Sequence, residues 1–164
     1  MAEDIAERVN RLERRIAHLE DRAAIYQLLA AYGPAADSGS IPEAVGLWAD
    51  DGVYDLHAQM MRGHADIADE LGGQWHQGLI KQGSAHIVSM PYVTIDGDKA
   101  VATCHSRLYR RENDGGYRVL SCSANRWELE RIGGRWRVRR RVSRRLDGSD
   151  ESHKVLADGF AAEA

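Results

Sequence analysis

The sequence predicts an α+β fold in which helices come first and a curved antiparallel sheet follows. Apolar residues recur with a helical period through the first half of the chain, and from residue 86 onward they alternate with a period of two. Glycine-rich turns at 97–98, 113–116 and 132–134 separate the alternating segments. Helices followed by long strands joined in this way are typical of a sheet with helices packed on one face. The 164 residues are enough for one domain and few for two.

Residues 1–20 are predicted to form an amphipathic helix with a narrow apolar seam. Its members alternate steps of four and three, and they are Ile5, Val9, Leu12, Ile16 and Leu19. Charged residues fill most of the other positions. Such a helix can pack on its own domain or serve as a contact between subunits, and the sequence leaves both open. The second alternative would make the chain a homo-oligomer, either a dimer or a trimer.

Three further helices are expected before the long strands. The first of them covers 21–33, where Pro34 lacks an N–H and is expected to stop or kink the helix. The others cover 41–49, with a proline suited to the first turn, and 63–73, closed by two glycines. Between these two helices, 50–56 reads as a turn into a brief strand.

Four alternating segments predict the strands of the sheet. They cover 86–96 (interrupted at Pro91), 99–112, 117–131 and 135–145. The residues after them, 147–164, are rich in glycine, serine and alanine and are expected to be a flexible tail. One domain is therefore expected over 21–146.

The composition argues against several classes of function. A net charge of −3 and a pI near 6.2 give no general attraction to nucleic acid or to an anionic membrane. The seven arginines of 135–145 are expected to pair with the many acidic residues. No apolar run approaches the roughly 20 residues that span a bilayer, and the N-terminus lacks a signal peptide's apolar segment. Cys104 and Cys122 read as reduced thiols, so a cytoplasmic location is expected.

His86 stands out among the seven histidines. His86 directly follows the flexible segment "KQGSA" and begins a strand whose next residue, Ile87, is apolar. His105 lies within a strand, where both a pocket-lining and an exposed position are open. His76 follows Trp75 in a segment rich in glycine and glutamine, which reads as a loop that can form one wall of a cavity.

Several stretches occur in a characteristic order along the chain. They are "DRAAIYQLLAAYGPAAD", "LWADDGVYD", the hairpin "TIDGDKA" and a final strand "GGRWRVRRRV". Over residues 20–146 this layout resembles the SnoaL-like branch of the NTF2-like cone folds, which includes scytalone dehydratase, hexachlorocyclohexane dehydrochlorinase and bile acid 7-alpha-dehydratase. The resemblance implies a cone-shaped antiparallel sheet wrapped around N-terminal helices, with a mostly apolar cavity inside.

The resemblance also implies a set of catalytic residues. The family's catalytic Asp falls on Asp37 and its His on His86. The Tyr that dehydratases place five residues before the Asp falls on Tyr32, and the last-strand Arg of the dehydrochlorinase falls on Arg141. Alternation in that strand puts Arg141 in the cavity only if its neighbours Trp136, Val138 and Val142 pack on the outer layer.

The chemistry of this set predicts proton abstraction. A neutral imidazole can take a proton from an activated carbon near pH 7, and a carboxylate on its other nitrogen fixes the tautomer and stabilises the imidazolium. Tyr32 can donate a hydrogen bond to a carbonyl or to a leaving hydroxyl. We therefore expect a cofactor-independent lyase, dehydratase-like or dehydrohalogenase-like, or an isomerase, without a metal site. The alternatives are a non-catalytic binding or accessory protein and a polyketide-cyclase-like enzyme.

The expected substrate is a hydrophobic cyclic small molecule. Dispersed positions are expected to shape its binding site, and they are Arg141, Trp48, Trp75, Met90, His105 and Tyr109.

Overall fold

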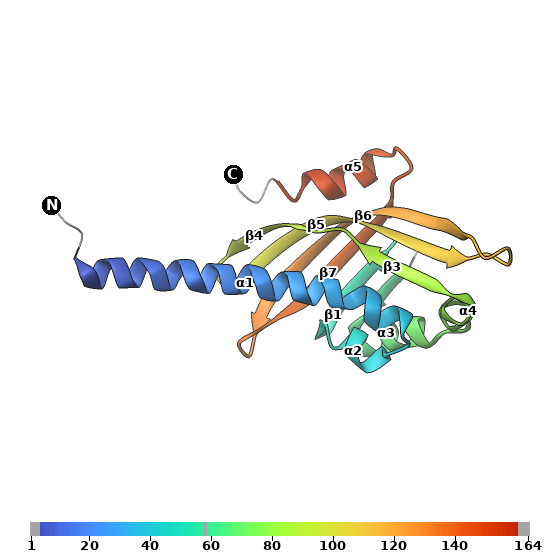
Figure 1. Cartoon of the computed structure of the whole chain (residues 1–164), viewed down its shortest axis with the longest axis horizontal. Coiled ribbons are helices and arrows are strands. Elements are labelled where there is room, and N and C mark those ends of the chain that lie inside the picture. The colour runs from blue at the N-terminus through green and yellow to red at the C-terminus, as the bar shows by residue number, and fades with distance from the viewer. Residues whose placement is uncertain (1–3, 58, 161–164) are drawn as a thin grey trace.

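A curved sheet of seven strands lies between one long helix on its inner face and a short helix on its outer face (Figure 1). The computed structural model describes residues 4–57 and 59–160. The helices are α1 (Ile5–Asp37), α2 (Ile41–Val45), α3 (Gly63–Gly72), α4 (Gln74–Gln82) and α5 (Asp150–Ala157). The strands are β1 (Trp48–Leu56), β2 (Gln59–Arg62), β3 (Ser84–Val88), β4 (Tyr92–Asp96), β5 (Lys99–Arg111), β6 (Tyr117–Ile132) and β7 (Arg135–Arg145).

The strand order is β2-β1-β7-β6-β5-β3, and β4 also pairs with β5. The α+β class and the curved sheet are therefore as predicted. The sheet is mixed rather than purely antiparallel, because β1 runs parallel to β7 and places Tyr54 beside Arg141. Two helices and five strands separate β1 from β7 along the chain, and a connection of that length lets two strands run in the same direction.

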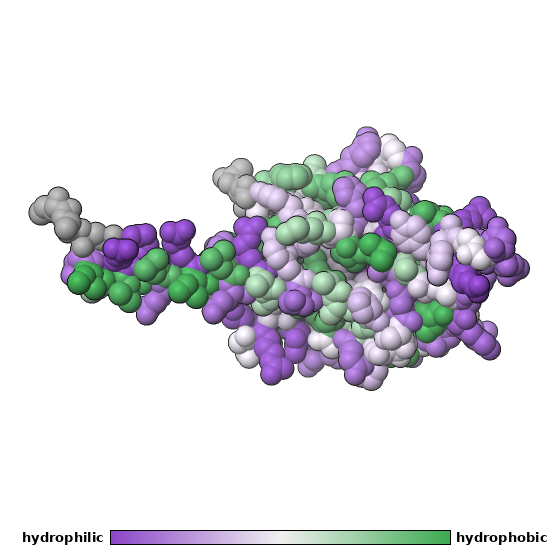
Figure 2. Space-filling model, viewed as in Figure 1, coloured by the Kyte–Doolittle hydropathy of each residue, from purple (hydrophilic) through white to green (hydrophobic). Residues whose placement is uncertain are grey.

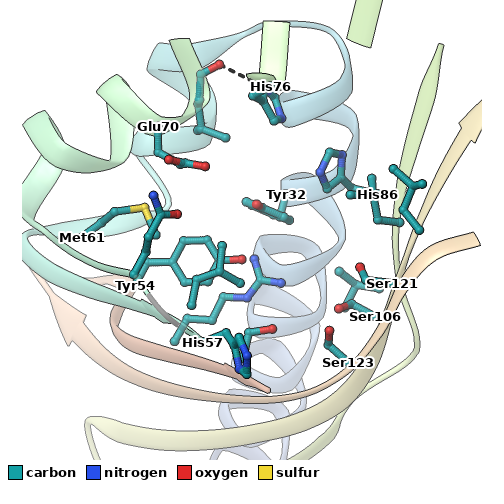
Figure 3. A pocket seen from close by; sticks show the side chains of 18 of the residues that line it. Tyr32, Tyr54, His57, Met61, Glu70, His76, His86, Ser106, Ser121 and Ser123 are labelled. Atoms are coloured by element: carbon teal, nitrogen blue, oxygen red, sulfur yellow. Dashed lines mark hydrogen bonds between the residues drawn. The ribbon is translucent and has the colours of Figure 1, made fainter. Parts of the chain in front are cut away.

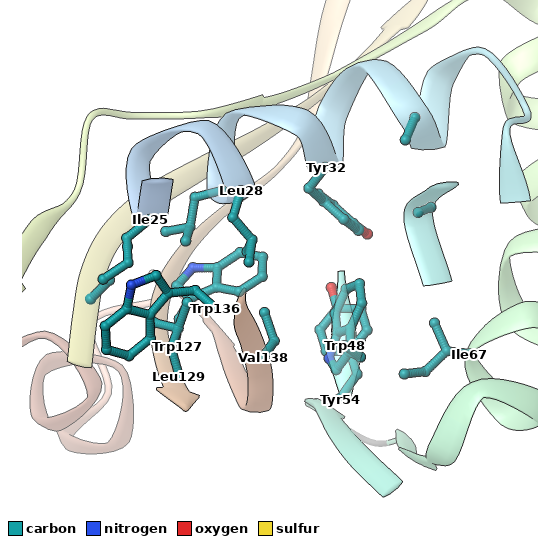
Figure 4. Close-up of a cluster of buried hydrophobic side chains, with 14 of the residues drawn as sticks. Ile25, Leu28, Tyr32, Trp48, Tyr54, Ile67, Trp127, Leu129, Trp136 and Val138 are labelled. Atoms are coloured by element: carbon teal, nitrogen blue, oxygen red, sulfur yellow. The ribbon is translucent and has the colours of Figure 1, made fainter. Parts of the chain in front are cut away.

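The core lies between the second half of α1 and the inner face of the sheet. Ile25 and Leu28 point from the helix toward the indoles of Trp127 and Trp136 (Figure 4). Where α1 enters the domain, Asp21 accepts hydrogen bonds from Arg131 Nη2 (2.7 Å) and Trp136 Nε1 (3.1 Å). These contacts fix the helix across the sheet.

The predicted helix stop at Pro34 is wrong, and so is the break between helices near residue 20. One helix runs from Ile5 to Asp37. Pro34 lies in its last turn with its ring exposed, so the proline removes one backbone hydrogen bond without displacing buried groups. The following alanines, Ala35 and Ala36, are buried and hold the last turn against the domain.

Two other segments differ from the expectation. The predicted helix over 41–49 ends at Val45, because Trp48 already belongs to β1. The predicted loop that contains His76 is the helix α4, which begins directly after α3. This helix forms a wall of the cavity described below.

Residues 147–160 are not a flexible tail, because they contain α5, which packs on the outer face of β6 and β7. Ser149 caps the helix by accepting a hydrogen bond from the backbone N–H of Ser152 (3.3 Å). Val155 is buried, and a Cβ at Gly159 would lie only 2.3 Å from the Thr103 side chain. The end of the predicted tail, 161–164, lies outside the described residues, as do 1–3 of the predicted first helix.

The first half of α1 leaves the domain and extends away from it (Figure 1). Every residue of 4–20 is exposed, so this segment does not pack on its own domain. The sequence left open whether this helix packs on its own domain or contacts another subunit. The first alternative is excluded, and the contact with another subunit stays a prediction. Within the described ranges, no helix combines the length and the apolar character needed to cross a membrane.

Candidate active site

A cavity of about 350 Å³ opens between the end of α1, the helices α3 and α4, and the inner face of the sheet (Figure 3). Apolar side chains such as Leu56, Met61, Ile67 and Leu120 form much of its wall. Tyrosine, histidine, serine and arginine side chains supply polar groups at separate places in the wall. A mostly apolar cavity with a few polar groups is the usual form of a small-molecule site.

Asp37 and His86, which are 49 positions apart, meet beside this cavity. His86 Nδ1 donates a hydrogen bond to Asp37 Oδ1 over 2.7 Å. A carboxylate can only accept here, so Nδ1 carries the proton and Nε2 keeps its lone pair in the neutral ring. His86 lines the cavity, and Asp37 lies behind it as its hydrogen-bond acceptor. The proline before Asp37 does not turn the carboxylate away.

Asp37 is held by two further donors. Its Oδ2 accepts the backbone N–H of His86 (2.6 Å), and its Oδ1 also accepts the Ser84 hydroxyl (2.8 Å). Burial raises the pKa of Asp37, but the hydrogen bonds from His86 and Ser84 outweigh it and lower the pKa below its ordinary value. The carboxylate is therefore ionised and fixed at neutral pH.

Gly33 permits the close packing that brings the pair together. A Cβ at this position would lie 2.1 Å from the carbonyl oxygen of His86, so the helix backbone touches the strand backbone here. Only glycine allows that approach. Asp37 lies one helical turn further on and therefore reaches the same residue of β3.

Tyr32 lines the cavity from the last turns of α1, with its hydroxyl directed inward (Figure 3). Its ring packs edge-to-face against His86, with ring centroids 6.1 Å apart, and against Trp48 and Trp127. These contacts hold the phenol rigidly beside the imidazole.

Arg141 faces the cavity, although the condition that strict alternation set for this direction is not met. Trp136, Val138 and Arg141 all lie on the inner face, because Arg139 forms a β-bulge that changes the alternation of β7. Trp136 and Val138 therefore need not pack on the outer layer for Arg141 to point inward. The prediction that they must do so is wrong.

The guanidinium of Arg141 is enclosed by aromatic rings. Its Cζ lies 4.2 to 4.6 Å from the ring centroids of Tyr32, Tyr54 and Trp127. Nε and Nη2 both donate to Asn125 Oδ1 (3.0 and 2.9 Å), whereas buried Nη1 has no partner within the described structure. Burial raises the pKa of the Tyr54 phenol above its ordinary value, and the positive charge of Arg141 offsets only part of this increase. The floor of the cavity thus holds a buried cation beside the neutral phenol of Tyr54.

Sequence reasoning did not name Glu70, and it named His76 only as part of a loop that can form a wall of a cavity. His76 lines the cavity from α4, its ring 5.3 Å from the ring of His86 between centroids, and its Nδ1 donates to the carbonyl of Leu71 (2.9 Å). Glu70 points into the cavity from α3 (Figure 3). A helical interpretation of "ADELGGQWHQ" could have predicted these positions, because it places Glu70 and His76 on two helices that face the sheet.

Burial lowers the pKa of His76, and the nearby His86 lowers it further. Below its ordinary pKa of 6.5 the unfolded chain takes up a proton that folded His76 does not, so stability is expected to fall with decreasing pH until the folded pKa is reached. One such group contributes at most about 1.4 kcal/mol per pH unit. Urea unfolding between about pH 5 and 7 should show a smaller slope for His76→Gln than for the wild type. The control His105→Gln should keep the wild-type slope, and equal slopes in all three proteins would contradict the prediction.

Four predicted binding residues do not line the cavity. Trp48 is buried behind it against Tyr54, and Met90 is 80% exposed between β3 and β4. His105 is exposed on the outer face of the sheet, since Ser106 and Leu108 take the inward positions. Tyr109 follows a β-bulge and is also absent from the lining. The fifth, Trp75, lies at the cavity rim and is 64% exposed.

Among the described residues, His, Cys, Asp and Glu side chains form no cluster of three or more suited to a metal ion.

The protein has an α+β fold in which a curved sheet and its helices enclose an apolar cavity, with an imidazole–carboxylate pair beside that cavity. These features define the class of cone-shaped α+β domains. The SnoaL-like domain matches residues 17–142, which is most of the chain. The protein therefore belongs to the SnoaL-like family of the NTF2-like superfamily, and the predicted resemblance is confirmed. The family includes isomerases, dehydratases and ring-hydroxylase subunits.

Solved structures agree with this assignment. An NTF2-like protein with a cystatin-like fold from Novosphingobium aromaticivorans is 38% identical with a TM-score of 0.87, covering 95% of this chain and 99% of that one. A variant of Rv3472, a protein of unknown function from Mycobacterium tuberculosis, is 20% identical with a TM-score of 0.70, covering 92% and 90%. A candidate aromatic ring hydroxylase from Novosphingobium aromaticivorans is 24% identical with a TM-score of 0.64, covering 78% and 90%. A comparison with curated proteins finds no match.

Proposed function

We propose that the protein is a cofactor-independent lyase or isomerase in which His86 acts as general base on a hydrophobic cyclic molecule. The observation that carries the proposal is the 2.7 Å hydrogen bond from His86 Nδ1 to Asp37 at the wall of an apolar cavity. That bond leaves Nε2 as the basic atom and places an ionised carboxylate where it stabilises the imidazolium. The free thiols of Cys104 and Cys122 support a cytoplasmic location as part of the same proposal.

In the lyase reaction, His86 Nε2 takes a proton from a carbon that an electron-withdrawing group activates. The electron pair of the broken C–H bond forms a double bond to the next carbon, which loses a hydroxyl or a halide. The hydroxyl leaves as water with the proton of Tyr32, and the imidazolium then returns a proton to Tyr32 through solvent. With a halide, the imidazolium releases its proton to solvent. Neither route requires a metal or an organic cofactor.

In the isomerase reaction, the electron pair moves into a neighbouring carbonyl and forms an enolate. Tyr32 donates a hydrogen bond to the enolate oxygen, and the cation of Arg141 lies 4.4 Å from the centroid of the Tyr32 ring. A phenol near a buried cation donates more strongly to an anionic oxygen. The imidazolium then returns the proton to a different carbon.

The cavity volume limits the substrate. An apolar cavity of about 150 Å³ holds one benzene ring, so the cavity of about 350 Å³ suits a molecule of one or two rings. The polar groups around the imidazole favour a ring that carries a carbonyl, a hydroxyl or a halogen. Cyclohexenone and the tetralones are therefore suitable probes.

The proposal is tested by proton exchange into these ketones, which needs only the first chemical step. In D₂O the wild type is expected to speed deuterium incorporation next to the carbonyl, measured by NMR. Asp37→Asn should slow this exchange about 10²- to 10⁴-fold, because the amide neither fixes the tautomer nor stabilises the imidazolium. Asp69→Asn, on the exposed face of α3, should match the wild type.

Three outcomes would contradict the proposal in different ways. Undiminished exchange in Asp37→Asn would remove the role of the pair. Binding of the probes, seen by quenching of tryptophan fluorescence, without any exchange would favour the non-catalytic binding or accessory protein. A product with a newly closed ring would favour the polyketide-cyclase-like alternative.

A further inference from the structure

The first half of α1 carries an apolar seam that its own domain leaves in water. The seam residues Ile5, Leu12 and Leu19 are 78%, 42% and 63% exposed. Figure 2 shows a stripe of hydrophobic surface along the extended part of the helix, which is otherwise mostly hydrophilic. A lone helix of this length is marginally stable in water, so a partner that covers the stripe would stabilise it.

The domain of the same chain cannot cover the seam. Farther along α1, Ile25, Leu29 and Tyr32 are the residues that face the core. With 3.6 residues per turn and no break in the helix, the seam points nearly opposite to that face. The partner must therefore come from outside, and the seam is directed away from the sheet.

The residue types of the seam indicate how many helices pair. Val9 and Ile16 occupy the a positions of a heptad, and Leu12 and Leu19 occupy the d positions. β-Branched residues at a combined with leucine at d favour two parallel strands. A trimer favours other combinations at these positions.

The charges beside the seam indicate a second copy of the chain as the partner. The g positions hold Arg8 and Arg15, and the e positions of the following heptads hold Glu13 and Glu20. In a parallel pair in register, each g residue lies beside the e residue of the next heptad in the other helix. Arg8 would then face Glu13 of the second copy, and Arg15 would face Glu20.

The opposite orientation is disfavoured by the same charges. In an antiparallel pair g faces g and e faces e, which would bring Arg8 and Arg15 against arginines and the glutamates against glutamates. Glu13 and Glu20 also have no arginine or lysine three or four positions away within their own helix. Helical spacing therefore gives these carboxylates no cation in the same helix.

We propose that two copies of this chain pair through residues 5–22 as a parallel, two-stranded coiled coil in register. This interface is independent of the proposed enzyme activity, because none of its residues lines the cavity.

The number of chains tests the first part of the proposal. Sedimentation equilibrium of the full chain should give twice the 18.3 kDa of one chain. Leu12→Asp with Ile16→Asp should give one chain and leave the domain folded, because both side chains are exposed. A single chain at every concentration in the wild type, a mass of three chains, or a dimer that survives both aspartates would overturn the proposal.

Charge exchange tests the pairing. Arg8→Glu with Arg15→Glu places glutamate opposite glutamate in the parallel pair, and the Kd of the dimer should rise about tenfold or more. Adding Glu13→Arg and Glu20→Arg exchanges every pair and should restore the wild-type Kd. In an antiparallel dimer the first change would only replace arginine–arginine contacts with glutamate–glutamate contacts, so an unchanged Kd would overturn the proposed orientation.

Cross-linking tests the register. In a Cys122→Ser background, Leu19→Cys should form a disulfide with the same residue of the second copy under mild oxidation. In an antiparallel pair each d residue packs against an a residue, which would bring Leu19 beside Val9, so efficient cross-linking of Leu19→Cys only when mixed with Val9→Cys would contradict the parallel register.

Discussion

Replacing His86 with alanine is expected to lower turnover about 10²- to 10⁴-fold, which is the contribution of a general base. The fold should remain, because the backbone N–H of residue 86 still donates to Asp37 Oδ2 and Ser84 still donates to Oδ1. Thermal unfolding and deuterium exchange into the ketone probes measure the two effects separately. Added imidazole should restore part of the activity, since the substitution leaves a space of that shape beside Asp37.

The matched control is His105→Ala. This histidine lies on the exposed outer face of the sheet, and its loss should leave both activity and stability unchanged. Wild-type exchange in His86→Ala would exclude His86 as the base. Lost activity that imidazole does not restore would be expected only if the substitution changed the cavity rather than the base.

Gly33→Ala is expected to be the most destabilising single substitution of a small residue in α1. Its Cβ would lie 2.1 Å from the carbonyl oxygen of His86, and two backbones rather than flexible side chains would have to separate. Overpacking of this kind costs about 3 kcal/mol or more, equivalent to a fall in Tm of roughly 10 °C. The separation would also lengthen the hydrogen bond from His86 to Asp37, so residual folded protein should be less active.

Gly78→Ala provides the comparison. Gly78 lies within α4, and a Cβ there would meet nothing within 4 Å. Alanine is the better helix former, so this variant should be as stable as the wild type or slightly more stable. Calorimetry of both variants decides the prediction, and equal Tm values would show that α1 and β3 do not pack as closely as described.

The sequence predicted the fold class because its periods differ clearly between the two halves. It could not predict that β1 runs parallel to β7, since strand direction depends on contacts between distant segments. It also misplaced the end of α1, because a proline stops most helices and tertiary packing of Ala35 and Ala36 overrides that tendency.

The His86–Asp37 contact was expected from the family resemblance rather than from any local pattern, because the two residues come from different elements. The inward direction of Arg141 depends on the β-bulge at Arg139, and no residue type in "RWRVRRRVSRR" marks a bulge. The side of the sheet that His105 occupies was left open for a different reason, because alternation does not say which face is inside.

The pairing of β1 with β7 has a consequence for how the protein is made. Tyr54 and Arg141 are neighbours in the sheet although they lie roughly 90 positions apart in the chain, and closing so long a loop is slow. During synthesis, the floor of the cavity therefore forms only after the last strand has left the ribosome. A chain that ends before β7 has the imidazole and its carboxylate but no enclosed space in which to use them.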